Sequence, residues 1–285
     1  MRIEHCQNGR THVWICGIKL LSWGPRRVKP FKNPKLGISY SVWDGEELLE
    51  QSIKQIRPVA DYINVVWQKL SWYGKPCNPG LEKLLLRLKD KGLIDELIFF
   101  EPDLSLEPVY NEINKRNIGL VAARRAGCTH FMTMDTDEFY DSKQFCDAYA
   151  DVINRNLTHT ACNTVAYMSP TLRYRDYSKF FCPFICKIDK GEQLQLACIK
   201  KQIPIAVDPS RQIPINRHSR ICILGNIVMH HMSMVRKDLD KKYDNSSANT
   251  KRDKNFGKDL KNPKKENLIT VPNAFHINIG KTTKD

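Results

Sequence analysis

The sequence predicts an α/β protein built on a doubly wound, mostly parallel sheet. Two observations predict this class. Strand and helix patterns alternate from residue 36 to residue 134, as in parallel sheets with right-handed crossovers. The chain has 285 residues, of which 41% are apolar, and this is enough for a substantial buried core.

Four strand patterns and three helix patterns follow one another in the first half of the chain. The strand patterns, rich in β-branched and aromatic residues, cover residues 37–43, 62–67, 96–100 and 130–134. The helix patterns, with apolar residues at helical spacing, cover residues 46–60, 81–92 and 118–127. Because ligands bind beyond the carboxyl ends of the strands in such sheets, the residues after position 134 are expected at the active edge.

The alternation becomes less regular after residue 145. Strands are expected at 161–168, 180–188 and 221–229, with long polar connections between them. Residues 237–253 are compatible with a helix, and 258–265 read as a solvated linker. Residues 14–21 are apolar with basic residues downstream, which indicates either a membrane-surface element or a short hairpin.

Cysteine usage and hydropathy indicate a cytoplasmic protein. The ten cysteines are scattered, and several lie in apolar runs, as free buried thiols do in a reducing compartment. Cys182 and Cys186 are the closest pair, but their spacing does not fit a zinc site. No secretory signal is recognisable, and no apolar run reaches the roughly 18 residues of a membrane span. We therefore expect a protein in solution or at the inner face of a membrane.

The positive charge is concentrated at the two ends of the chain. Residues 1–36 hold eight Lys and Arg against one Glu, and residues 236–285 hold thirteen against seven acids. The residues between them are nearly neutral, with 24 basic and 23 acidic side chains. Basic ends fit a polyanionic surface such as anionic lipid, lipopolysaccharide or nucleic acid, or they keep the protein soluble.

Three carboxylates follow the fourth strand pattern: Asp135, Asp137 and Glu138. Like charges this close raise one another's pKa, so the cluster requires a metal ion or a basic partner. In an extended segment Asp135 and Asp137 project to the same side. Hard oxygen ligands suit Mn²⁺ or Mg²⁺, which can neutralise the charge on a departing diphosphate.

Six short motifs occur in order between residues 35 and 236. They are the first strand with its acidic turn (37–47), KRNIG (115–119), AGCTH (126–130), DTDEF (135–139), VDPSR (207–211) and MHHMSMVR (229–236). This ordered set resembles the GT-A-fold glycosyltransferases of the family 2 type, bacterial enzymes that build surface polysaccharide such as lipopolysaccharide or capsule. The resemblance implies a GT-A-like sheet, a nucleotide-sugar donor, Mn²⁺ or Mg²⁺, and Asp135 and Asp137 as metal ligands.

The resemblance covers residues 35–236, which we expect to divide into a nucleotide-sugar-binding half (35–145) and an acceptor-side half (146–236). The charge distribution sets apart a basic N-terminal segment (1–34) and a basic C-terminal helix or tail (237–285). A late histidine often completes the metal shell in the resembling enzymes. His231 is the expected ligand and His230 the alternative, unless both are structural histidines with ordinary hydrogen bonds.

The catalytic residues are predicted less directly. An inverting enzyme needs a carboxylate base for the acceptor hydroxyl, and Asp208 is the candidate, although it could instead form an Asx turn with Ser210. Arg211 could contact phosphate or acceptor through its guanidinium.

Donor contacts are expected near the ends of the first two strands and on the third helix. Ser41 and Asp44 follow the first strand, and Gln68 follows the second. Arg116 and Arg124 are candidates to pair with the diphosphate, although Arg124 could instead lie on a solvated helix face.

The predicted function is metal-dependent transfer of a sugar from a nucleotide diphosphate to a hydroxyl acceptor, a glycan or glycolipid in surface polysaccharide or lipopolysaccharide synthesis. Two alternatives stay open. One is a phage-type glycosyltransferase acting on a modified nucleic-acid base, which the basic ends permit but no recognition-helix or zinc-finger signature supports. The other is a nucleotidyltransferase, although 41–45 is a poor match to its phosphate loop. A pure binding module would not need three clustered carboxylates at a sheet edge.

Overall fold

The computed structural model describes residues 2–5, 11–15, 18–23, 30–196, 209–216, 218–245 and 264–278. Its first strands, β1 (Arg2–His5), β2 (Thr11–Ile15) and β3 (Ile18–Trp23), form a three-stranded antiparallel sheet. In this sheet Trp14 pairs with Lys19 and Ile15 with Ile18. The pairing corresponds to the hairpin, one of the two interpretations of residues 14–21.

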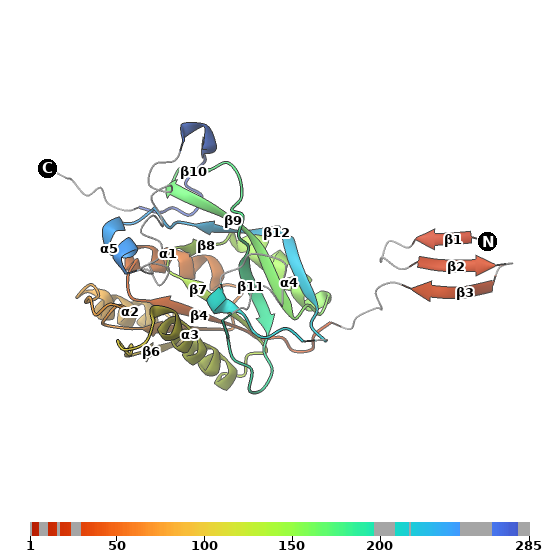
Figure 1. Ribbon diagram of the computed structural model, residues 1–285, viewed down its shortest axis with the longest axis horizontal. Helices are drawn as coiled ribbons and strands as arrows, with labels where there is room; N and C mark the ends of the chain where they lie inside the picture. Colours follow the sequence, from red (N-terminus) through yellow and green to blue (C-terminus); the bar gives the residue numbers. More distant parts are fainter. Residues whose placement is uncertain are drawn as a thin grey trace.

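The main sheet has a parallel centre with the strand order β6-β5-β4-β7. Figure 1 labels three of these strands, β4, β6 and β7. The four strands are β4 (Leu36–Val42), β5 (Tyr62–Trp67), β6 (Glu96–Phe99) and β7 (His130–Asp135). They are connected by the helices α1 (Glu46–Ile56), α2 (Leu81–Asp90) and α3 (Pro108–Arg125). All pairings among the four strands are parallel. The predicted α/β class is therefore confirmed.

The residues of β4 explain why helices cover both faces of the sheet. Side chains alternate along a strand, and every second residue from Leu36 to Val42 is large, apolar and buried in one core with α1, α2 and α4. The intervening residues are small, and α3 packs against them. A Cβ atom at Gly119 of α3 would collide with Ser39 Oγ, so the helix and strand approach closely only because this position is glycine. Asn64 Nδ2 donates to the Gly119 carbonyl at 3.0 Å and fixes the same contact.

The second half of the chain extends the sheet beyond β7. There β11 (Cys182–Lys187) is antiparallel to both β7 and β9 (His159–Ser169), and β12 (Ile221–His231) is parallel to β9. The last residues of β12 pair with β8 (Glu138–Phe139), with His231 opposite Glu138. Two short strands, β10 (Leu172–Tyr174) and β13 (Leu268–Thr270), complete one edge. The end of β12 therefore lies beside the acidic motif.

The predicted strands agree with the structure to within a few residues, but two helices differ. α3 begins at Pro108, ten residues before the predicted start at 118, with proline in the first turn, where a missing N–H costs nothing. α4 (Ser142–Asn154) was not predicted; Asp141 caps it by accepting a hydrogen bond from Gln144 N.

The remaining short elements are η1 (Pro209–Arg211), α5 (Leu239–Asp244) and η2 (Lys265–Asn267). The helix expected over 237–253 corresponds to α5, and its positions after 245 lie outside the described residues. The cysteines in the described parts are free, as expected. Among the described helices, none is long and apolar enough to cross a membrane.

Candidate active site

The acidic motif lies where three strands end. Asp135 is the last residue of β7 and is level with Ser41 on the neighbouring β4. β12 ends at His231, opposite Glu138. This is the carboxyl edge of the parallel strands, where ligands bind in open α/β sheets.

Asp135 is held by two arginines from different elements. Arg116, from α3, places Nη2 3.1 Å and 3.2 Å from the two carboxylate oxygens. Arg211, from η1, donates from Nη2 to Oδ2 at 2.6 Å. The Asp135 side chain is 35% exposed, whereas both guanidinium groups are almost fully buried. Asp135 is therefore a fixed, partly accessible acid.

Glu138 lies behind Asp135 and shares Arg211 with it. Arg211 Nη1 donates to Glu138 Oε2 at 2.9 Å, and the Asp135 backbone N–H donates to the same oxygen at 3.1 Å. Burial raises the pKa of Glu138; Arg211 opposes this shift and the Asp135 charge adds to it. Arg211 thus bridges the two acids, and its predicted contact with phosphate or acceptor stays a prediction.

Asp137 points away from these arginines and meets another set of cations. Its side chain is 3% exposed, and Oδ2 accepts hydrogen bonds from Lys242 Nζ at 2.6 Å and from Arg236 Nη2 at 2.7 Å. His231 Nε2 lies 3.6 Å from the same oxygen. Burial acts to raise the pKa of Asp137, but Lys242, Arg236 and His231 together hold it well below its usual value. Asp137 is therefore a buried carboxylate with its charge balanced.

The two late histidines have different surroundings. His231 faces Asp137, whereas His230 packs on Phe275 and accepts or donates a hydrogen bond at Nδ1 with the Tyr167 hydroxyl at 2.9 Å. Burial lowers the pKa of His230 to about 4, so it stays neutral. Of the two, His231 is the one placed at the site.

Of the residues predicted to bind the nucleotide sugar, some lie beside the acidic motif and others do not. Asp44 Oδ1 lies 3.3 Å from Arg236 Nη1, and the Asp44 carbonyl accepts from Thr136 Oγ1 at 3.2 Å, so Asp44 belongs to the site. Gln68 is fully buried; its Nε2 donates to the Leu70 carbonyl at 2.6 Å. Ser41 and Arg116 adjoin Asp135, as described above.

Arg124 lies at the opposite edge of the sheet. It is near the C-terminal end of α3, next to the start of the parallel strands, and its Nη2 donates to the Glu192 carbonyl at 2.7 Å. The adjacent Arg125 pairs with Glu96, the first residue of β6. Arg124 is thus apart from the cluster that contains Arg116. Asp208, the predicted base, lies outside the described residues.

Three basic residues at the site were not predicted: Lys115, Arg236 and Lys242. Lys115 is fully buried, donates from Nζ to the Val42 carbonyl at 2.9 Å and lies 5.5 Å from the Trp72 ring centre. Burial lowers its pKa to about 7, against the opposing effect of the Asp135 charge. Arg236 is the last residue of the motif MHHMSMVR (229–236), which is a signal in the sequence. Lys242 lies in a polar stretch that holds no recognisable motif.

The carboxylates do not form a divalent-cation site in this arrangement. Within the described parts of the chain, no three His, Cys, Asp or Glu side chains are grouped so as to hold a metal ion. Mn²⁺ or Mg²⁺ needs oxygen ligands at about 2.0–2.1 Å, yet Lys242 and Arg236 both contact Asp137 Oδ2 and two arginines hold Asp135. The ligand roles of Asp135, Asp137 and His231 stay predictions.

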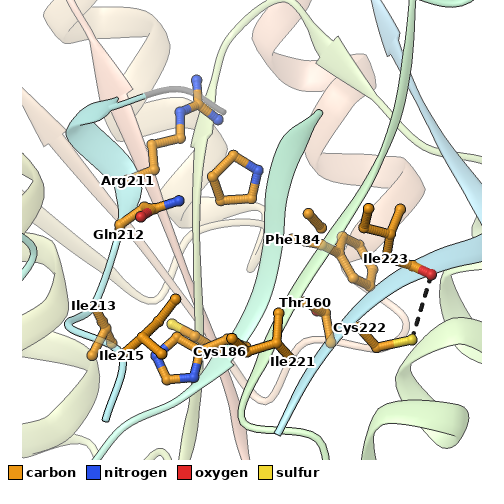
Figure 2. A pocket seen from close by; sticks show the side chains of 13 residues that line it. Thr160, Phe184, Cys186, Arg211, Gln212, Ile213, Ile215, Ile221, Cys222 and Ile223 are labelled. Carbon is orange, nitrogen blue, oxygen red and sulfur yellow. Dashed lines mark hydrogen bonds between the residues drawn. The ribbon is translucent and has the colours of Figure 1, made fainter. Parts of the chain in front are cut away.

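An apolar pocket lies beside the cluster, with Arg211 and Gln212 at one end (Figure 2). Its walls come mainly from β9, β11 and β12 and from the segment after η1. The apolar lining residues include Pro183, Phe184, Ile213, Ile215, Ile221 and Ile223. Because Arg211 also contacts Asp135, the pocket and the acidic motif share one side chain.

Comparisons with known proteins give similarity to solved structures alone. No protein-family model and no curated protein matches the chain. Residues 1–349 of TarS from S. aureus are 14% identical with a TM-score of 0.36, over 70% of this chain and 60% of TarS. The TarS complex with UDP is 12% identical with a TM-score of 0.34, over 46% of this chain and 36% of TarS.

A third similar structure is GalNAc-T7 with UDP, GalNAc and Mn²⁺, at 11% identity and a TM-score of 0.40. It is matched over 71% of this chain and 45% of its own length. The chain thus spans less than two thirds of each of these structures. The function proposed below rests on the site itself.

Proposed function

We propose that this protein is a glycosyltransferase that moves a sugar from a nucleotide diphosphate sugar to a hydroxyl acceptor. One observation carries the proposal: the Asp135 carboxylate is fixed between the guanidinium groups of Arg116 and Arg211 at the carboxyl edge of a doubly wound sheet. The preorganised acids and cations suit a ligand that combines hydroxyl groups with a diphosphate.

The residues divide the work of the transfer between them. The acceptor oxygen forms a bond to the anomeric carbon while the bond from that carbon to the diphosphate oxygen breaks. The acceptor proton passes to a carboxylate base, for which Asp208 remains the candidate, and the departing diphosphate takes the electron pair. The buried Arg and Lys side chains at this edge of the sheet stabilise the negative charge that builds on the departing diphosphate.

The acceptor is proposed to be a glycan or glycolipid of surface polysaccharide or lipopolysaccharide synthesis. The apolar pocket next to Arg211 supports an acceptor with an apolar portion. The basic ends of the chain support work at an anionic membrane surface, since each Lys or Arg near such a surface contributes about 1 kcal/mol. The requirement for Mn²⁺ or Mg²⁺ stays a sequence-based prediction.

A donor screen tests the proposal. Purified protein is titrated with a panel of nucleotide sugars and, as competitors of another class, nucleoside triphosphates, each with and without Mn²⁺. We expect the wild type to bind one nucleotide sugar and to hydrolyse it slowly. Asp135→Asn should lose both activities. The control Asp147→Asn should keep both, because Asp147 is exposed and, among the described residues, pairs only with the exposed Lys143. A preference for nucleoside triphosphates would favour a nucleotidyltransferase. Binding of duplex DNA with transfer to its bases would favour the nucleic-acid acceptor.

A further inference from the structure

The position of Asp137 within the motif is where a divalent cation would be expected, and two side-chain cations are there instead. Lys242 Nζ and Arg236 Nη2 lie 2.6 Å and 2.7 Å from Oδ2. Clustered carboxylates require either a metal or a basic partner. Arg236 and Lys242 together balance the charges of Asp137 and Asp44, so this part of the site is already neutral.

Lys242 is fixed in place by the short helix that carries it. Its Nζ also donates to the Ser233 carbonyl at 3.1 Å. Asp238 caps α5 through the Lys241 N–H, and Lys241 Nζ lies 4.7 Å from the centre of the Trp43 ring, at the end of β4. The Lys242 ammonium group is thus fixed directly by Asp137 and the Ser233 carbonyl, and indirectly by the packing of α5 on Trp43.

Arg236 carries donors that its protein surroundings leave unused. Its side chain is 6% exposed, and within the described residues Nε has no hydrogen-bond acceptor, while Nη1 makes no hydrogen bond and only an ion-pair contact with Asp44 Oδ1 at 3.3 Å. Buried N–H groups without acceptors are costly, and phosphate oxygens match the spacing of a guanidinium group. The guanidinium also lies against Gly45, where φ is 70° and a Cβ atom would collide with Nη1. The site is shaped around an arginine with spare donors.

We propose that Lys242, together with Arg236, takes the place of a divalent cation at Asp137 and binds the diphosphate of the donor directly. The inference rests on the proposed glycosyl transfer. Asp137 then orients the two cations and need not ligate a metal. Arg236 gives its unused donors to the diphosphate, and Lys242 stays close enough to neutralise the charge that develops when the diphosphate departs.

The test measures nucleoside diphosphate binding without metal. Protein freed of metal with EDTA is titrated with UDP, GDP and dTDP by calorimetry, in EDTA and again in Mn²⁺, and Mn²⁺ binding to the protein alone is followed by electron paramagnetic resonance. We expect one diphosphate to bind equally well in EDTA and in Mn²⁺. Lys242→Met should weaken that binding about tenfold, as expected for loss of a charged hydrogen bond, and should leave binding of the corresponding nucleoside unchanged.

Two variants control for unfolding and for general charge. Lys242→Arg, which keeps the charge, should retain most of the affinity, and Lys237→Met, at an exposed position beside α5, should retain all of it. Diphosphate binding that requires Mn²⁺, or tight Mn²⁺ binding by the wild-type protein alone, would overturn the inference and leave the glycosyl transfer standing. If no diphosphate binds in either buffer, the proposed function fails and the inference with it.

Discussion

Replacing Asp137 by asparagine should destabilise the fold strongly, because the carboxylate is the shared counter-charge of two buried cations. The side chain is 3% exposed, with Lys242 and Arg236 at 2.6 Å and 2.7 Å. Removing one partner from a buried ion pair costs about 3–5 kcal/mol. With an m value of about 3 kcal/mol/M in urea, this corresponds to a midpoint lowered by about 1–2 M.

Urea unfolding followed by circular dichroism measures this shift. Asp135→Asn should cost less, because Asp135 is 35% exposed and water screens its ion pairs. Asp147→Asn, at a position that is 58% exposed, should leave the midpoint within about 0.2 M. Equal midpoints for Asp137→Asn and the wild type would refute the conclusion that Asp137 holds the two cations together.

The contacts of Asp137 with Lys242 and Arg236 also predict how the stability of the fold depends on pH. The folded protein holds the pKa of Asp137 well below the value of 3.8 expected in the unfolded chain. The stabilisation is therefore complete above that value and is lost as the pH falls through the folded pKa. The wild type should lose stability below pH 3.8 more steeply than Asp137→Asn. Parallel curves for the two proteins would contradict the assigned pKa shift.

Three further predictions concern Gly45, Lys115 and the basic ends of the chain. Gly45→Ala should weaken nucleoside diphosphate binding at least about tenfold, because the added Cβ atom would collide with Arg236. Gly92→Ala is the matched control. It has a similar backbone strain, at φ 72°, but its added Cβ atom would meet no other atom within 4 Å, so binding should not change. Because the pKa of Lys115 is about 7 in the fold and 10.5 in the unfolded chain, the unfolded chain binds more protons between these values. The free energy of unfolding should then rise by about 1 kcal/mol per pH unit above pH 7, and Lys115→Met should remove that slope. Salt should release the full chain from anionic liposomes without changing turnover on a small soluble acceptor; binding that survives high salt would contradict electrostatic docking.

The strands and the acidic motif could be predicted from the sequence because local patterns specify them. β5 has the predicted bounds, and its residues other than Asn64 are β-branched or aromatic and nearly all buried. α4 was missed although Phe145, Ala148 and Val152 recur at helical spacing on its buried side, so a signal was present. The first ten residues of α3 are mostly polar, and their few apolar residues form no continuous face, so the earlier start had little local signal.

The pairing within the site could not be predicted in the same way. Arg236 and Lys242 meet Asp137 across 99 and 105 residues of sequence, and no spacing rule relates positions so far apart. Clustered carboxylates require either a metal or a basic partner, and the sequence predicts a metal at Asp135 and Asp137. Only the fold, which brings the end of β12 and α5 to the end of β7, shows that basic partners lie there.

The close contact between Ser39 and Gly119 has a consequence for how this protein can vary. Gly119 is one turn of α3 beyond Lys115 and Arg116, so its distance from β4 sets how far their side chains reach toward the site. A larger residue at 119 would lift the helix and withdraw Arg116 from Asp135 without touching either. Across related sequences, positions 39 and 119 should therefore change only together, one shrinking as the other grows. A deep sequence set in which they vary independently while Arg116 is kept would show that the helix has another support.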